Sequence, residues 1–180
     1  MAIAPDGTTE FSRPLRLDRL SAGAFEATFE ASRAELADLA TRFDLPGIRR
    51  LSGSLRVRRP GGGPLIRVEG SVEAEVTQVC VVTLAEISNR IEESFVQLYT
   101  LDPQPAEEEE VFIAPGDEET PEPIPGNSLD LGEVLAEQLA LALDPHPRAP
   151  GAEFGSATIG ADVDDEAHPF AKLADLKWRH

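Results

Sequence analysis

The sequence is poor in cysteine and has no long hydrophobic run. Its 180 residues contain a single cysteine, Cys80, so no disulfide can form within the chain, and a lone thiol is compatible with a reducing compartment. No run of about 18 apolar residues occurs, so we expect no membrane-spanning helix. Residues 1–19 lack a basic start followed by an apolar core, and we therefore expect no secretory signal. Together these absences favour a cytoplasmic protein.

Side chains that commonly bind metals or carry out catalysis are scarce as well. The histidines His146, His168 and His180 lie in or beside proline-rich or terminal segments. A zinc site needs several histidine, cysteine or carboxylate ligands held by one scaffold. Cys80 is flanked by valines, which favours a buried structural thiol over an activated nucleophile. We expect no catalytic residue, metal site, cofactor or small-molecule substrate, and hence no enzyme.

Positive charge is missing from a long stretch of the chain. No lysine or arginine lies between Arg90 and Arg148. Residues 91–180 hold 21 acidic and four basic residues, so the net charge of −17 resides in this half, while residues 1–70 are near neutral. Proteins that bind nucleic acid over a wide surface neutralise its phosphates with lysine and arginine. The distribution therefore disfavours broad RNA contact and favours a basic protein partner, although an acidic tail that only keeps the chain soluble would have the same composition.

The first part of the chain predicts two strands and a short helix. Residues 11–17 have a strand-like composition, and a proline inside them indicates an edge position. Residues 24–31 alternate apolar and polar side chains, which is typical of a half-buried strand. Ser32 and Glu35 have the spacing of a capping box, and apolar side chains then recur at helical spacing over residues 33–43.

The clearest pattern in the sequence is an antiparallel β-hairpin. Apolar and polar side chains alternate over residues 51–58 and again over residues 66–76, and the glycine- and proline-rich residues 60–64 predict a turn between them. Residues 87–101 continue as one or two further strands. Successive antiparallel strands around a helix indicate an α+β fold. We expect an antiparallel β-sheet or a small, partly open β-barrel with two or three short helices and a long acidic loop.

These elements divide the chain into two parts. We expect a single α+β domain over residues 1–148, within which the proline-rich residues 102–126 form an acidic flexible loop. Residues 149–180 then form a flexible linker, 150–167, and a short helical motif for which Pro169 suits the first turn.

A predicted helix over residues 130–144 carries acidic side chains without basic partners on the same helix. Asp130 has the character of an N-cap, and Glu133 and Glu137 lie on one side with Asp144. Like charges at this spacing cost roughly a few tenths of a kcal/mol. These acidic side chains therefore either face the arginines of the hairpin or bind a cationic partner. The second alternative makes Glu133 and Glu137 candidate partner-binding residues.

The predicted hairpin also carries candidate RNA-binding residues, Arg56, Arg58 and Arg67. Side-chain parity places them on its polar face with Glu69 and Glu73. These guanidinium groups either contact RNA phosphates or pair across the strands with the glutamates, or with the acidic helix.

A short apolar motif lies near the end of the sequence. Phe170, Leu173 and Leu176 line one side of the predicted final helix, and Lys177 lies in its C-terminal half. A helix this short is marginal in water, so it must dock either on its own domain or in a groove of a partner. These four residues are further candidates for partner binding.

Three segments of the chain resemble segments of a known family. They are a strand leading into a cysteine, a helix after an acidic loop, and a closing P-F-A-K-L-A-D-L-K: Val76–Leu84, Leu129–Pro145 and Pro169–Lys177. In this order and spacing they resemble the YceD family of large ribosomal RNA subunit accumulation proteins. Many relatives carry C-x-x-C where this chain has Cys80 and, in the second position, Thr83. No metal role of such a cysteine pair applies to this chain.

The resemblance implies a non-enzymatic ribosome biogenesis factor that supports accumulation of 23S ribosomal RNA and assembly of the large subunit in bacteria, where such genes commonly neighbour one for a large-subunit ribosomal protein. Together with the charge distribution, it predicts binding of a basic ribosomal protein or of a pre-50S ribosomal particle. The alternative is direct binding of 23S rRNA through the arginines of the hairpin.

Overall fold

The structure, a computed structural model, describes residues 10–20, 24–102 and 121–153. The chain divides into two units, residues 1–149 and 150–180, and every helix and strand described below lies in the first unit. Among the described residues, no helix combines the length and the apolar composition that crossing a membrane requires.

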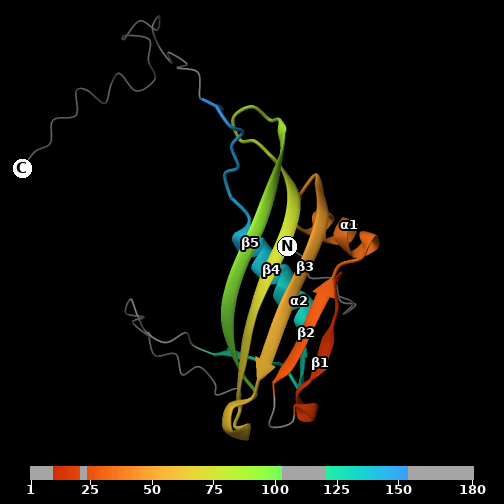
Figure 1. The fold of residues 1–180 in the computed structure, drawn as a ribbon, viewed down its shortest axis with the longest axis vertical. Helices are drawn as coiled ribbons and strands as arrows, with labels where there is room; N and C mark the ends of the chain where they lie inside the picture. Colours follow the sequence, from red (N-terminus) through yellow and green to blue (C-terminus); the bar gives the residue numbers. More distant parts are fainter. Residues whose placement is uncertain (1–9, 21–23, 103–120, 154–180) are drawn as a thin grey trace, which may run out of the picture. The chain divides into compact units, whose positions relative to one another are not determined.

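Five strands of the described part of the chain form one sheet (Figure 1). In spatial order they are β2 (Phe25–Glu30), β3 (Gly47–Arg58), β4 (Leu65–Val79), β5 (Glu86–Thr100) and β6 (Glu122–Pro123). Neighbouring strands are antiparallel except β5 and β6, which are parallel. Strands β2 and β6 lie at opposite edges, so the sheet is not closed.

The predicted α+β class is therefore confirmed, whereas the alternative of a partly open barrel is wrong. The reason lies in what buries the apolar side of the sheet. Strands β3 and β4 turn alternate apolar side chains to one side, where Leu51, Leu55, Val68 and Val72 are almost completely buried. A helix, α2 (Leu131–Ala142), packs on that side, so the sheet does not need to curl on itself to cover it.

The predicted hairpin forms as expected from its alternating pattern. Strands β3 and β4 pair from Gly47–Thr77 to Arg58–Arg67, and a short 3₁₀ turn, η2 (Pro60–Gly62), connects them. Gly61 and Gly62 have φ values of 64° and 67°, a conformation that favours glycine. The region predicted as one or two further strands is the single strand β5.

The two helices begin at the residues that the sequence indicates. Helix α1 (Arg33–Arg42) starts with a capping box in which Ser32 and Glu35 exchange hydrogen bonds. Helix α2 starts at Asp130, whose side chain accepts hydrogen bonds from the first turn. Both caps satisfy backbone N–H groups that have no partner inside the helix.

The N-terminal segment differs from its prediction as a strand over residues 11–17. Only β1 (Pro14–Arg16) is extended, and it pairs with β7 (Ser128–Asp130) in a separate two-stranded sheet. A 3₁₀ turn, η1 (Leu17–Arg19), follows directly. Phe11, which lies three residues before β1, is not part of this strand and is completely buried.

The C-terminal end of the predicted acidic loop, residues 102–126, contains a strand and a buried side chain. Strand β6 pairs with Tyr99 and Thr100, and the next residue, Ile124, is buried. One apolar side chain thus anchors this end in the core. Residues 103–120 lie outside the described residues, as do the predicted linker beyond residue 153 and the predicted final helix.

Candidate interaction surfaces

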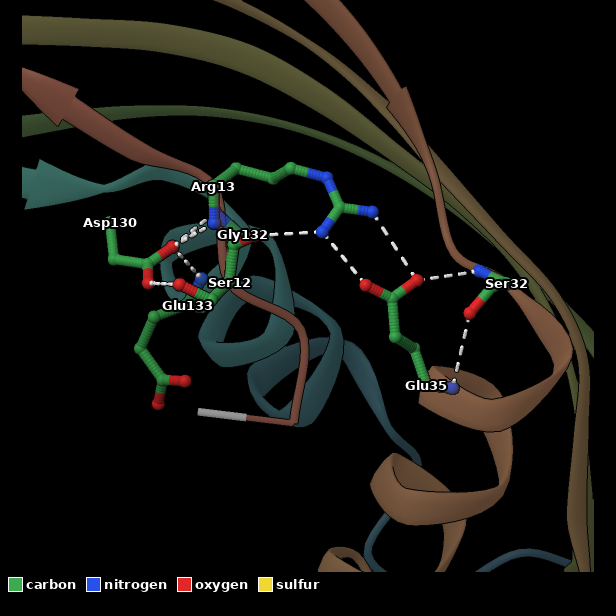
Figure 2. A network of polar contacts seen from close by, with 7 residues as sticks. All are labelled: Ser12, Arg13, Ser32, Glu35, Asp130, Gly132 and Glu133. Carbon is green, nitrogen blue, oxygen red and sulfur yellow. Dashed lines mark hydrogen bonds and ion pairs between the residues drawn. The ribbon is translucent and has the colours of Figure 1, made fainter. Parts of the chain in front are cut away.

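The N-terminal segment links the starts of the two helices (Figure 2). The Arg13 guanidinium donates hydrogen bonds to both carboxylate oxygens of Glu35, at 2.7 and 3.3 Å. The Ser32 N–H donates to Glu35 Oε2 at 2.7 Å. Hydrogen bonding from Arg13, supported by Ser32 and opposed by burial, lowers the pKa of Glu35 to about 2. The Arg13 backbone N–H also donates to Asp130 Oδ1 at 2.6 Å, so one residue connects both helix caps.

Asp130 holds the first turn of α2 in place. Its Oδ1 accepts the N–H groups of Gly132 and Glu133 at 2.9 and 3.3 Å, and its Oδ2 accepts the Ser12 hydroxyl at 2.5 Å. Burial raises the pKa of Asp130, but these hydrogen bonds and the one from Arg13 outweigh it and leave the pKa below its ordinary value. The network fixes α2, and with it the acidic side chains that α2 carries.

The first of these acidic side chains meets a cation from α1. The Arg42 guanidinium donates to both carboxylate oxygens of Glu133, at 2.9 and 2.5 Å, and also to Glu10 at 3.2 Å. This pairing raises the pKa of Arg42 above its ordinary value. Within the described residues, Glu133 therefore pairs with an arginine of α1 and not with a hairpin arginine.

The second acidic side chain, Glu137, forms no ion pair within the described residues. Partial burial, followed by the negative charges of Glu133 and Glu122, raises the pKa of Glu137, and Arg42 opposes this effect. Glu122 lies on β6 and is exposed. Burial, followed by the charges of Glu137 and Glu122, also raises the pKa of Tyr99 at the end of β5. We call Glu122 and Glu137 the acidic corner.

The candidate arginines lie on the solvent-facing side of β3 and β4, as predicted, and each contacts a carboxylate. Arg56 Nε lies 2.9 Å from Glu26 Oε1 of β2. Arg58 and Arg67, directly opposite each other, share Glu69 at 3.4 and 2.7 Å. Three guanidinium groups thus contact two carboxylates.

Cys80 holds the segment that follows α2 against the β4–β5 turn. The thiol is buried, as predicted, and its Sγ accepts the N–H groups of Thr83 and Ala149 at 3.4 and 3.2 Å. Hydrogen bonding from Thr83, then from Ala149, lowers the pKa of Cys80 to about 6 against the opposing effect of burial. The Val81 N–H donates to the Pro147 carbonyl at 2.9 Å. These contacts give Cys80 a structural place in the fold.

The candidates of the C-terminal motif, Phe170, Leu173, Leu176 and Lys177, lie outside the described residues. Within the residues that the structure does describe, no group of three or more histidine, cysteine, aspartate or glutamate side chains is arranged to hold a metal ion.

Two residues that interact with the acidic side chains of α2, Arg42 and Glu122, were not predicted from the sequence. Arg42 ends a predicted helix and gives no sign of its partner, because Glu133 is 91 positions away in the chain. Glu122 falls inside the predicted loop. Ile124, an apolar residue two positions after Glu122, was an available signal.

A family model described as "Large ribosomal RNA subunit accumulation protein YceD" matches residues 68–177, which include most of β4 and all of β5 and α2. Neither the curated proteins nor the solved structures give a match. The family match covers more than half of the 180 residues. The chain therefore belongs to the YceD family of large ribosomal RNA subunit accumulation proteins.

Proposed function

We propose that this chain is a non-enzymatic assembly factor that supports accumulation of 23S rRNA by binding a basic ribosomal protein or a pre-50S particle. The family match supplies the connection with large-subunit ribosomal RNA. The observation that carries the choice of partner is the absence of lysine and arginine between Arg90 and Arg148, in a half with a net charge of −17. Such a field attracts cationic proteins and repels phosphates.

The arrangement of charges in the described residues supports this choice. In the acidic corner, partial burial, followed by repulsion from the negative charges of Glu133 and Glu122, raises the pKa of Glu137. A cationic partner placed there would relieve this repulsion. The hairpin arginines, in contrast, already contact Glu26 and Glu69, so RNA phosphates would have to displace these carboxylates.

Capture of the tagged full chain from cells tests the proposal. At low salt we expect basic large-subunit ribosomal proteins to remain bound after ribonuclease treatment, as identified by mass spectrometry. Glu122→Gln with Glu137→Gln should lower the recovery, whereas Arg56→Gln with Arg58→Gln, which removes the same number of charges, should leave it unchanged. Recovery of no ribosomal component at low salt contradicts the proposal. Recovery that is lost on ribonuclease treatment and in the arginine variant would show direct RNA binding instead.

A further inference from the structure

Strand β5 has an uncovered edge along most of its length. It pairs with β4 from Glu86 to Thr100 without a register shift, but β6 covers its other side only at Tyr99 and Thr100. Figure 1 shows β5 along the outer side of the sheet. Within the described residues, no strand lies beside residues 86–98. A strand edge of this kind is a template for pairing with another strand.

Hydrogen-bond directions identify the free backbone groups of this edge. The Thr100 carbonyl accepts the Ile124 N–H at 2.9 Å, on the side away from β4, whereas the Leu101 N–H donates to the Pro64 carbonyl on the β4 side. Backbone groups alternate in direction from one residue to the next along a strand. The even-numbered residues over 88–98 therefore turn their N–H and C=O groups outward, and the described residues offer these groups no backbone partner.

The charged side chains along and beside the edge are predominantly acidic. The carboxylates on β5 itself and in the acidic corner beside its end are Glu86, Glu92, Glu93, Glu122 and Glu137. The only cation on β5 is Arg90, which is paired with Glu92. Val96, with 40% of its surface exposed, adds an apolar contact.

This charge pattern selects among the strands that could bind. Two copies of the chain meeting at this edge would bring like charges together. Residues 103–120 hold seven acidic and no basic residues, so they are repelled as well. A basic extended segment is attracted instead. Charges on an edge strand are a common protection against self-association, and here the same charges admit a cationic strand.

We infer that the free edge of β5 binds an extended, lysine- and arginine-rich segment of a partner protein as an added β-strand. The inference rests on the proposed function and specifies how the basic partner is held. Main-chain hydrogen bonds to the outward groups over residues 88–98 supply the affinity, and the carboxylates select for positive charge. A disordered basic tail, which folds as it binds, is the kind of segment that fits this edge.

Amide exchange of the full chain, followed by NMR, tests the inference directly. The probe is a fluorescein-labelled peptide of alternating lysine and threonine, about nine residues long, chosen for charge and strand propensity. We expect the even-numbered amides over residues 88–98 to exchange rapidly in the free protein and to become protected by the peptide. The odd-numbered amides over 89–97 bond to β4 and should be protected throughout.

An analogue of the peptide with N-methylated backbone amides serves as the matched probe. It keeps the charge but cannot pair as a strand, so we expect its binding to be at least about tenfold weaker in fluorescence anisotropy. Equal binding of the two peptides overturns the inference, as does protection at other amides only. Even-numbered amides already protected without peptide would show that this chain covers its own edge, which also overturns it.

A proline substitution localises the binding site on the protein. Val96→Pro removes an outward N–H and leaves the bonds to β4 intact, and we expect about tenfold weaker peptide binding. Thr28→Pro is the matched control on β2, the opposite edge. The Ala31 N–H bonds to the Leu51 carbonyl of β3, so by alternation the Thr28 N–H points outward as well. This control should change affinity less than about twofold, and circular dichroism verifies that both variants fold.

The two proposals fail in different ways. If basic ribosomal proteins are captured equally by the parent chain and by Val96→Pro, the β5 edge is not their binding site, although the proposed function stands. If neither chain captures them, the proposed function itself is wrong. The comparison of the two peptides requires no variant, so it decides the inference even where Val96→Pro does not fold.

Discussion

Among single residues, Arg13 joins parts of the fold that are distant in the sequence. It contacts Glu35, 22 positions away, and Asp130, 117 positions away. Its guanidinium carbon also lies 4.6 Å from the centre of the Phe11 ring, at a distance where a cation is attracted to the aromatic face. Phe11 is completely buried, so the short N-terminal segment fastens both helix starts to the core.

The pH dependence of the free energy of unfolding tests this joint. The folded protein holds the pKa of Glu35 at about 2, below the value near 4.3 of an unfolded chain. The resulting stability is therefore present above about pH 5 and is lost as pH falls towards 2. Glu35→Gln should lower the free energy of unfolding by about 1–2 kcal/mol at neutral pH, and by roughly half as much near pH 3. Urea denaturation at the two pH values measures this.

Glu73→Gln provides the control for this prediction. Glu73 is exposed on the solvent-facing side of the sheet, so its substitution should change the free energy of unfolding by less than about 0.5 kcal/mol at either pH. A difference between Glu35→Gln and the parent that stays the same from neutral to acidic pH would show that the charge of Glu35 contributes nothing to the joint.

At the scale of elements, the approach of α2 to the sheet depends on one glycine. A Cβ atom at Gly53 of β3 would lie 2.4 Å from Leu135 Cδ2 of α2 and 2.8 Å from the Ser71 carbonyl oxygen of β4. Leu135 is completely buried. The missing side chain at this position therefore makes room for the helix that covers the apolar side.

Substitution of this glycine should displace α2. We expect Gly53→Ala to lower the free energy of unfolding by about 1–3 kcal/mol through overpacking, and Leu135→Ala by about 2–5 kcal/mol through the cavity that it leaves. The double variant should cost at least about 1 kcal/mol less than the sum, because the shorter side chain removes the clash with Leu135, although the close approach to the Ser71 carbonyl oxygen remains. Ser52→Ala, the neighbouring position facing solvent, is the matched control. Strictly additive effects in urea denaturation would contradict the contact.

The elements themselves could be predicted well from the sequence, because their signals are local. A period of two gave β3 and β4, and the capping residues Ser32 and Asp130 gave the two helix starts. The position of α2 on the sheet could not be predicted, because periodicity shows which side of an element is buried but not what buries it. The question of sheet or barrel remained open for the same reason.

The candidate site was less accessible to sequence reasoning. The alternation of side chains along a strand correctly placed Arg56, Arg58 and Arg67 on the solvent-facing side of the sheet. Glu69 was among their predicted ion-pair partners. The free edge of β5 could not be seen, because it depends on which strand follows β5 in space and on the direction of each N–H group. Glu122 was hidden by the composition of its surroundings, since acidic, proline-rich segments usually remain unstructured.

At the scale of the whole molecule, negative charge accumulates in one half of the chain. The net charge of residues 91–180 is −17, and repulsion among like charges destabilises a folded chain. In the described part, the pKa of Glu137 already reflects this repulsion. The ion pairs on the solvent-facing side of the sheet, such as Arg56–Glu26, are exposed and contribute little to the free energy of unfolding. Screening these pairs with salt should therefore destabilise the fold only slightly.

Salt should therefore stabilise the free protein. Raising the NaCl concentration to about 0.5 M shortens the screening length to a few ångströms, and we expect the melting temperature to rise by about 2–5 °C. Glu122→Gln with Glu137→Gln should show a smaller rise, because fewer charges remain to be screened, whereas Arg56→Gln with Arg58→Gln should show a rise at least as large as the parent. A bound basic protein neutralises the same charges, so it should raise the melting temperature at low salt. The further rise in melting temperature on adding salt should then be smaller. Differential scanning fluorimetry with and without the partner measures both effects. A melting temperature that falls with salt would mean that attraction between opposite charges, and not repulsion, dominates this molecule, and the electrostatic argument for a cationic partner would then lose its basis.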